Sequence, residues 1–186
     1  YLSALVNFFG PIASVSGSAA TPFTERVITT RARAGERIPV GTPTHISALL
    51  EFESGAVATL LTSFDAKASR LPRIEVYGSE GTLGVPDPNT FGGPVLLGLP
   101  GSKEWEELPI GHGFTDNSRG VGLADMAHAI TSGAEPRASG ELAFHVLDAM
   151  QAILEAAQAG RRVELQSSCA RPAPLPMDLP AGLLRP

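Results

Sequence analysis

The sequence lacks several features that mark whole classes of protein. It has one cysteine, Cys169, among 186 residues, so no disulfide forms within the chain, as is usual in a reducing cytoplasm. It has no apolar run of the roughly 18 to 20 residues that a membrane-spanning helix needs. It also shows no signal-peptide pattern of basic, apolar and small residues at its start. We therefore expect a cytoplasmic protein that does not associate with membranes.

Basic charge is scarce as well. The chain has 14 Lys and Arg residues against 19 Asp and Glu, which gives a net charge of −5, and its basic residues are scattered along the sequence. Such a surface repels phosphate backbones, and this excludes nucleic acid as an expected partner.

Side chains that carry out covalent or metal chemistry do not cluster in the sequence. The four histidines, His45, His112, His128 and His145, have no metal-ligand spacing. No G-x-S-x-G pattern occurs, and no base or cationic cluster lies near Cys169 to lower its pKa. We assign no catalytic, cofactor-binding or metal-binding residue within this chain.

The chain contains instead a succession of short apolar elements separated by turn residues. A helix is expected over 2–9, where glycine and proline at positions 10 and 11 end it. Strands are expected over 12–16, 26–31, 44–52, 57–64, 73–76, 82–85, 95–99, 105–108 and 163–165. The turn 78–81 has glycines that permit a positive φ. Successive hairpins favour an antiparallel meander.

Two longer helices are expected in the second half. The first has Asn117 or Ser118 as its cap and Gly133 as its terminator, and the second extends from about Ser139 to Gly160. Their apolar faces are predicted to be Leu123, Met126, Ala127 and Ile130 in the first, and Leu142, Val146, Ala149, Met150 and Ile153 in the second.

These elements predict an α+β fold with a large, mostly antiparallel sheet and helices packed on one face. Strand 57–64 has large apolar groups in both alternating sets, Val57, Thr59 and Leu61 against Ala58, Leu60 and Phe64. Because successive side chains point to opposite faces, we expect the second face to be covered by self-association. One domain is expected over 1–165, followed by a Pro-rich tail, 166–186, that is an extended arm or a loose end.

The most promising binding segment is the loop 113–119. It is polar and leads into a helix N-terminus, where backbone N–H groups and the helix dipole favour oxygen-rich or anionic ligands. Asn117 and Arg119 are the predicted substrate-binding residues, because Arg119 adds a guanidinium with fork geometry. The alternative is that Asn117 only caps the helix and Arg119 forms a surface ion pair.

The order of the elements resembles a known family. A helix ending at Gly10 and Pro11 is followed by the hairpin 48–58, the segment Glu75–Leu83 with the sequence EVYGSEGTL, and the helix segment 123–133. This order resembles the C-terminal domain of the Gfo/Idh/MocA oxidoreductases, the glucose-fructose oxidoreductase and inositol dehydrogenase family, from Tyr1 to about residue 165.

The resemblance implies a two-domain enzyme with an N-terminal Rossmann domain that binds NAD or NADP. The family's catalytic lysine, carboxylate and His or Tyr are expected before Tyr1, so Tyr1 receives no catalytic role. By this resemblance, the chain is a C-terminal piece of an NAD(P)-dependent dehydrogenase acting on a sugar, polyol or related hydroxyl compound. It would form a substrate-pocket wall and a subunit interface, lack the Rossmann domain, bind no cofactor and be inactive alone. The alternative is a self-contained, non-catalytic α+β binding or dimerisation module.

Overall fold

The computed structural model describes residues 1–177, and its contacts divide the chain into two compact units. The host unit combines residues 2–69 with 140–171. The inserted unit comprises Tyr1, residues 70–139 and the chain from Pro172. The predicted division into 1–165 and a tail stays a prediction, because compactness alone does not define a domain.

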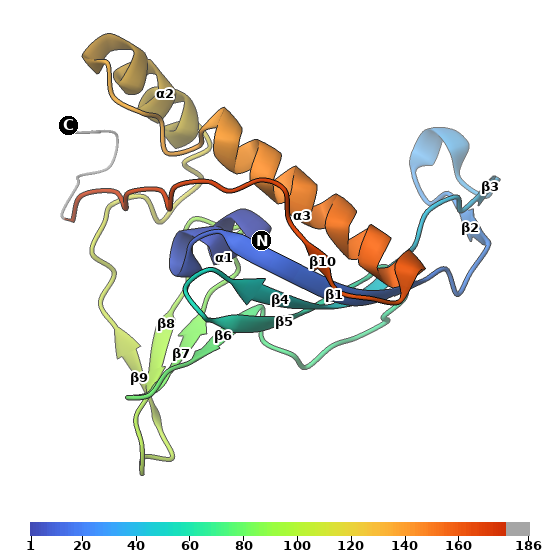
Figure 1. Ribbon diagram of the computed structural model, residues 1–186, viewed down its shortest axis with the longest axis horizontal. Coiled ribbons are helices and arrows are strands. Elements are labelled where there is room, and N and C mark those ends of the chain that lie inside the picture. Colours follow the sequence, from blue (N-terminus) through green and yellow to red (C-terminus); the bar gives the residue numbers. More distant parts are fainter. Residues whose placement is uncertain (178–186) are drawn as a thin grey trace. The chain divides into compact units, whose positions relative to one another are not determined.

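The host unit is built on a four-stranded antiparallel sheet in the order β10-β1-β4-β5 (Figure 1). Its strands are β1 (Ile12–Ala20), β4 (His45–Phe52), β5 (Val57–Ser63) and β10 (Val163–Glu164). Gly55 has a φ of 86°, which a residue with a side chain rarely adopts, and so allows the tight turn between β4 and β5. The predicted strands are confirmed here, although β1 continues four residues beyond its predicted end.

Two helices, α1 (Leu2–Phe9) and α3 (Gly140–Ala159), cover one face of this sheet. The ring of Phe9 packs against Phe52 with 5.2 Å between centroids, and a methyl group at Gly17 would lie 3.4 Å from a side-chain carbon of Ile153. The glycine therefore lets α3 approach β1 closely. The buried residues of α3 are Leu142, His145, Ala149, Ala152, Ile153 and Ala156.

The predicted apolar stripe of α3 is partly wrong. Met150 is exposed and Val146 only half-buried, whereas His145 and two more alanines, Ala152 and Ala156, face inward. Small side chains occupy the contact because the helix lies so close to the sheet that long side chains do not fit beneath it.

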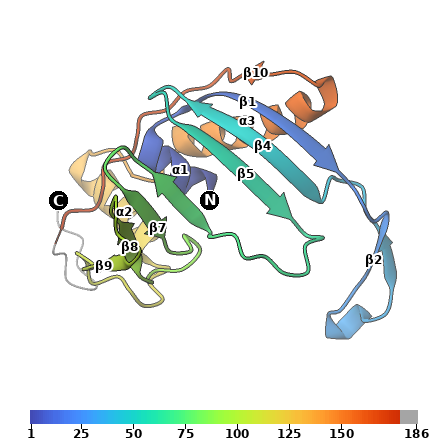
Figure 2. The ribbon, with the colours of Figure 1, turned by 90° about the horizontal axis from the view of Figure 1, so that it is seen from below.

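The opposite face of this sheet is open within the host unit. Register places Leu49, Thr59 and Leu61 on that face, whereas Ala58 and Leu60 lie toward the helices. Among the described residues of the unit no helix covers the open face, as Figure 2 shows from below.

A small hairpin extends from the host unit between β1 and β4. It consists of β2 (Glu25–Val27) and β3 (Arg37–Pro39), joined through a short 3-10 helix, η1 (Arg31–Arg33). The strand predicted over 26–31 is therefore shorter and ends in a turn. Asp65 anchors the hairpin, because Arg26 and the Thr44 hydroxyl both donate to its carboxylate, at 2.5 and 2.7 Å.

The inserted unit has a second four-stranded antiparallel sheet, a meander in the order β6-β7-β8-β9. Its strands are β6 (Ile74–Tyr77), β7 (Thr82–Val85), β8 (Val95–Gly98) and β9 (Trp105–Leu108). The predicted hairpins are confirmed, but Gly78 and Gly81 do not have positive φ values. Gly81 is needed for a different reason, since a Cβ there would lie 2.8 Å from the carbonyl oxygen of Gly98.

Helix α2 (Val121–Ser132) of the inserted unit differs most from its prediction. Leu123, Met126 and Ile130 are exposed, and the buried residues are Asp125 and Ala129. The predicted inward face is therefore wrong within the described chain. The predicted terminator is confirmed, because Gly133 adopts a left-handed conformation with φ of 71°.

The segment after β10 is extended, and its first part packs on the host unit. The N–H and hydroxyl of Ser167 both donate to Asp148, at 3.0 and 2.7 Å, and Cys169 is buried. Residues 178–186 of the predicted tail lie outside the described residues. No helix in residues 1–177 has the length and apolar character needed to cross a membrane. Antiparallel sheets with helices on one face confirm the predicted α+β class.

Candidate functional site

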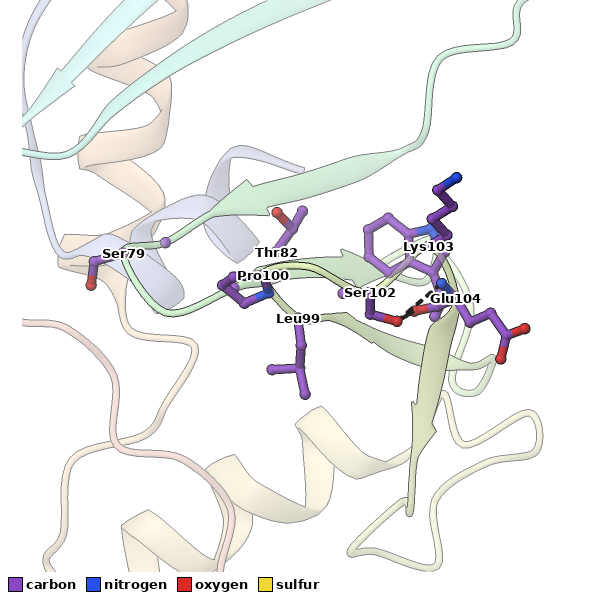
Figure 3. Close-up of a pocket in the computed structure, with 11 residues that line it drawn as sticks. Ser79, Thr82, Leu99, Pro100, Ser102, Lys103 and Glu104 are labelled. Atoms are coloured by element: carbon purple, nitrogen blue, oxygen red, sulfur yellow. Dashed lines mark hydrogen bonds between the residues drawn. The ribbon is translucent and has the colours of Figure 1, made fainter.

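A pocket lies at the end of the inserted unit's sheet, where two hairpin turns meet. The turn 78–81 joins β6 to β7, and the turn 99–104 joins β8 to β9. Together they line a cavity of about 310 Å³, with Ser79, Thr82, Ser102, Lys103 and Glu104 among its polar residues (Figure 3). The volume lies at the lower end of the range usual for small-molecule sites, which is about 300 to 1,000 Å³.

The floor of this pocket is a row of three residues that face each other across β7, β8 and β9. Thr82 pairs with Gly98, and Gly98 pairs with Trp105. A methyl group at Gly98 would lie 3.3 to 3.5 Å from three consecutive carbons of the indole ring. Because these distances are nearly equal, the ring lies over the glycine by its face and not by its edge. Trp105 as a whole is 46% exposed.

Most polar side chains of the pocket are available to a ligand. Within residues 1–177, Ser79, Thr82, Lys103 and Glu104 have no side-chain hydrogen bond or ion pair. Ser102 is the exception, because its hydroxyl accepts from the Glu104 N–H at 3.1 Å and donates to the Glu104 carbonyl at 3.0 Å. Figure 3 shows Lys103 and Glu104 extending in different directions.

The predicted substrate-binding loop lies in the same unit, between β9 and α2. Phe114 is buried and holds the loop in place, and its N–H donates to Nδ1 of His112 at 3.1 Å. Asn117 and Arg119 are both exposed. Within the described chain neither side chain has a hydrogen-bond or ion-pair partner. The role of these two residues in substrate binding stays a prediction.

The start of α2 lacks the expected side-chain cap. The capping residue is Gly120, not Asn117 or Ser118, and no side chain bonds to the first turn. The carbonyl of Ser118 accepts from the Val121 N–H at 2.9 Å, so this backbone turn replaces a side-chain cap. The prediction of a cap at 117 or 118 is wrong, because the backbone satisfies the helix start by itself.

A part-buried ion pair joins Asp125 of α2 to Arg137, in the segment that follows the helix. The Arg137 guanidinium contacts Asp125, whose other carboxylate oxygen accepts from the Arg137 N–H at 2.8 Å. Arg137 also donates from Nε to the Ala173 carbonyl at 3.1 Å. Both carboxylate oxygens of Asp125 thus accept hydrogen bonds within the unit, which indicates a structural role for this group.

Tyr1 and Asp87 form a second polar contact that the sequence did not predict. The Tyr1 hydroxyl donates to Asp87 at 2.7 Å, and this bond raises the pKa of the tyrosine. The Asn89 N–H and the Tyr1 hydroxyl both donate to Asp87 and hold its pKa below the usual value. Arg73 lies 3.4 Å from the same carboxylate. The turn at 87–90 uses Asp87 as its acceptor, which accounts for the residue without catalysis.

The remaining reactive groups have structural environments. Burial raises the pKa of the Cys169 thiol, which makes it a poor nucleophile. His145 lies inside the host unit, bonded to β1 and to Ser167. Within residues 1–177, no group of three or more His, Cys, Asp or Glu side chains is arranged to hold a metal ion.

Comparison with known proteins gives one family match over the first part of the chain and several fold matches. Residues 1–84 match the model of the GFO/IDH/MocA C-terminal domain, a stretch that includes the segment Glu75–Leu83. No curated protein sequence matches the chain. The fold matches an NAD-binding oxidoreductase from Klebsiella pneumoniae with a TM-score of 0.68 and 21% identity, over 90% of this chain and 49% of that one.

Other solved structures give the same result. Levoglucosan dehydrogenase in complex with NADH matches with a TM-score of 0.70 and 16% identity, over 89% of this chain and 48% of that one. Aldose-aldose oxidoreductase from Caulobacter crescentus, complexed with glycerol, matches with a TM-score of 0.63 and 23% identity. The match covers 88% of this chain and 44% of that one. The chain spans about half the length of these structures. The predicted resemblance is therefore confirmed over residues 1–84, which match the model of the GFO/IDH/MocA C-terminal domain, and the fold resembles about half of each of these solved oxidoreductases.

Proposed function

We propose that the chain is the C-terminal substrate-binding and oligomerisation part of an NAD(P)-dependent dehydrogenase acting on a sugar, polyol or related hydroxyl compound. The family match over residues 1–84, joined to a fold shared with about half of several NAD-binding oxidoreductases, carries this proposal. The named relatives support the substrate class, because they include levoglucosan dehydrogenase and aldose-aldose oxidoreductase.

In this proposal the redox cofactor is NAD or NADP, held by a Rossmann domain elsewhere in the full-length protein. Dinucleotide binding of that kind uses parallel strands joined by a crossover helix. Every strand pair in residues 1–177 is antiparallel. We therefore expect this chain alone to bind no NAD(H) or NADP(H) in a calorimetric titration, and micromolar binding would contradict the assignment.

The full-length protein provides the main test. With NAD+ or NADP+ and a panel of aldoses and polyols, we expect NADH or NADPH to form with at least one substrate. Absence of turnover across the panel with both cofactors would favour the alternative, a non-catalytic binding or dimerisation module. The cytoplasmic location stays a prediction.

Arg119 is the residue that we propose contacts the substrate, together with Asn117. Arg119→Ala in the full-length enzyme is expected to lower kcat/KM by about 10 to 100-fold, the effect of losing one charge-assisted hydrogen bond. The melting temperature should stay nearly unchanged, because Arg119 is exposed and unpaired within the described residues. Steady-state kinetics and thermal unfolding measure the two effects.

Arg70→Ala is the matched control, since Arg70 is an exposed arginine of the same unit with no ion pair in the described chain. Equal kinetic losses in both variants would indicate a general charge effect. A fall in stability without a kinetic change would make Arg119 structural.

Self-association through the open face of the host sheet is the second part of the proposal. Exposed Leu49, Val57 and Leu61 share this face with hydroxyl side chains such as that of Thr59. At one end the face is charged, because Ser14 donates to Glu51 at 2.6 Å and Arg162 lies 2.8 Å from the same carboxylate. An interface of ordinary stability would bury about 800 Å² on each subunit.

Leu61→Lys is expected to dissociate this dimer at micromolar concentration, because it places a charge in a contact that excludes water. Sedimentation measures the effect, and far-UV circular dichroism checks that the fold remains. Leu147→Lys on α3 is the matched control, since the two leucines are 48% and 49% exposed. A monomeric unmodified protein, or dissociation by both variants, would refute an interface at this face.

A further inference from the structure

We propose that the pocket at the end of the β6–β9 sheet binds a neutral sugar ring, which stacks on the exposed face of Trp105. The site is formed by Thr82, Gly98 and Trp105 in one row across three strands, with the two hairpin turns around it. It is separate in sequence from Asn117 and Arg119 and requires no redox cofactor.

The first argument is the platform that the indole provides. A large aromatic side chain at the surface exposes apolar area that water solvates poorly. A Cβ at Gly98 would lie 3.3 to 3.5 Å from three carbons of the Trp105 ring, so the absence of a side chain there lets the ring lie close to the sheet. Trp105 is 46% exposed and lines the pocket. One face of a pyranose ring carries mainly C–H groups, so it fits such a surface.

The second argument is the chemistry around the platform. Thr82 and Ser79 present hydroxyls that have no partner within residues 1–177. A hydroxyl both donates and accepts hydrogen bonds, as the hydroxyls of a sugar do. Lys103 and Glu104 are neighbours of opposite charge, so the pocket has no net charge to attract a phosphate group. The ligand class is therefore polar and uncharged.

The third argument is size. The cavity measures about 310 Å³, which is close to the smallest volumes of ligand sites in proteins. A monosaccharide fits a site of this volume, whereas a dinucleotide would extend far beyond the turns that form it.

Trp105 makes the site directly measurable, because it is the single tryptophan of the chain. Titration of this chain with D-glucose or D-xylose is expected to shift the tryptophan emission saturably, with a Kd of about 1 mM, as expected for a ligand of this size. Saturation-transfer NMR provides a second readout that does not depend on fluorescence. Inorganic phosphate is the comparison ligand and should produce no saturable shift.

Two variants test the geometry. Thr82→Val keeps the shape of the side chain and removes the hydroxyl, so binding should weaken by about 5-fold, the effect of one hydrogen bond. Gly98→Ala puts a methyl group 3.3 Å from the indole and displaces the ring, so we expect a loss of at least about 10-fold. Thr29→Val, at an exposed threonine of the hairpin of the host unit and outside the proposed self-association face, is the matched control and should bind like the unmodified chain.

Several results would overturn this site. They are the absence of saturable sugar binding, equal binding of phosphate, or equal weakening in Thr82→Val and Thr29→Val. Should Gly98→Ala fail to fold, Thr82→Val with an unchanged circular dichroism spectrum decides the question alone. The assay uses neither cofactor nor turnover, so its failure leaves the proposed dehydrogenase activity standing, and an inactive full-length protein leaves this site standing.

Discussion

The two four-stranded sheets of this chain differ in burial although their strands are similarly apolar. In β4 of the host unit, Ala48, Leu50 and Phe52 are buried, whereas no residue of β6 to β9 in the inserted unit is buried. Strand β8 begins with a valine and two leucines, so its composition does not explain the difference. The host sheet has α3 packed on one face. Burial is therefore determined by what covers a strand, not by the strand's own sequence.

The inserted unit has few buried apolar residues, and polar contacts join its segments instead. Its buried residues in the described chain are Phe114, Asp125 and Ala129. Ion pairing of Asp125 with Arg137 and the bond between Tyr1 and Asp87 connect its segments. Apolar burial contributes most to folding stability, so we expect the host unit to be the more stable and the inserted unit to open first.

Truncation of a leucine in each sheet should produce the largest difference. Leu50→Ala empties a site that is fully buried, and should lower the free energy of unfolding by about 2 to 5 kcal/mol. Leu96→Ala removes a half-buried side chain from β8, and its cost should be about 1 kcal/mol. Urea unfolding followed by circular dichroism measures both. Equal losses would show that the second sheet has a core as tightly packed as the first.

A buried histidine gives the next largest effect. The N–H of Ile12 donates to Nε2 of His145 at 2.9 Å, which assigns the ring proton to Nδ1, 2.9 Å from the Ser167 hydroxyl. His145→Phe leaves the Ile12 N–H buried without an acceptor and should cost about 2 to 3 kcal/mol in thermal or urea unfolding. His128→Phe on α2 is the control, because that half-buried side chain forms no hydrogen bond in the described chain.

If both histidine variants were equally stable, the polar connection between α3 and β1 would contribute nothing. The host unit would then depend on apolar packing alone. That result would widen the contrast with the inserted unit, whose described segments are joined mainly by polar contacts.

The smallest expected effect depends on pH. The hydroxyl of Ser167, followed by backbone N–H groups, bonds to Asp148 and lowers the pKa of its carboxyl group. A lowered pKa in the folded state stabilises the protein above the unfolded value of about 3.9, and this contribution is lost as the pH falls through the folded value. Asp148→Asn should therefore cost about 1 to 2 kcal/mol at neutral pH and progressively less below about pH 4.

Urea unfolding of both proteins at several pH values measures this dependence. Asp116→Asn, in the exposed loop of the inserted unit, should show no such change. A cost for Asp148→Asn that stays constant from neutral pH to acid would mean that the carboxylate charge is not the stabilising feature.

The sequence predicted the strands well because their signals are local. Alternating side chains and turn residues placed β4, β5 and β7 within one residue of their observed ends, and Gly133 ended α2 as expected. The family resemblance required only the order of such elements. Each of these features depends on neighbours along the chain, which the sequence contains in full.

The inward faces of the helices were predicted less well, because they depend on what lies opposite. Leucine and methionine dominate the hydrophobic pattern of α2 and α3, yet Leu123 and Met150 are exposed. A recognisable signal existed in α3, where Ala149, Ala152 and Ala156 recur on one face, as is typical of a close helix contact.

Of the two candidate sites, one depends on residues adjacent in the sequence and the other on residues that only the fold brings together. The polar loop with Asn117 and Arg119 was visible in the sequence, since its residues are adjacent. The pocket was not, because Thr82, Gly98 and Trp105 come together only through the register of three strands. Once the strand pairing is known, a glycine opposite the single tryptophan indicates a surface on which a ligand ring can stack.

The discontinuity of the host unit affects how the protein folds during synthesis. Strand β1 is bonded to His145, which in turn contacts Ser167, so the first strand of the host sheet cannot complete its contacts until more than 130 later residues have been made. Residues 70–139 form an intervening loop whose closure costs entropy before α3 can pack. During translation β1, β4 and β5 therefore leave the ribosome before α3, with their helix-facing leucines uncovered. We expect this intermediate to be the species most prone to aggregate and most in need of chaperones.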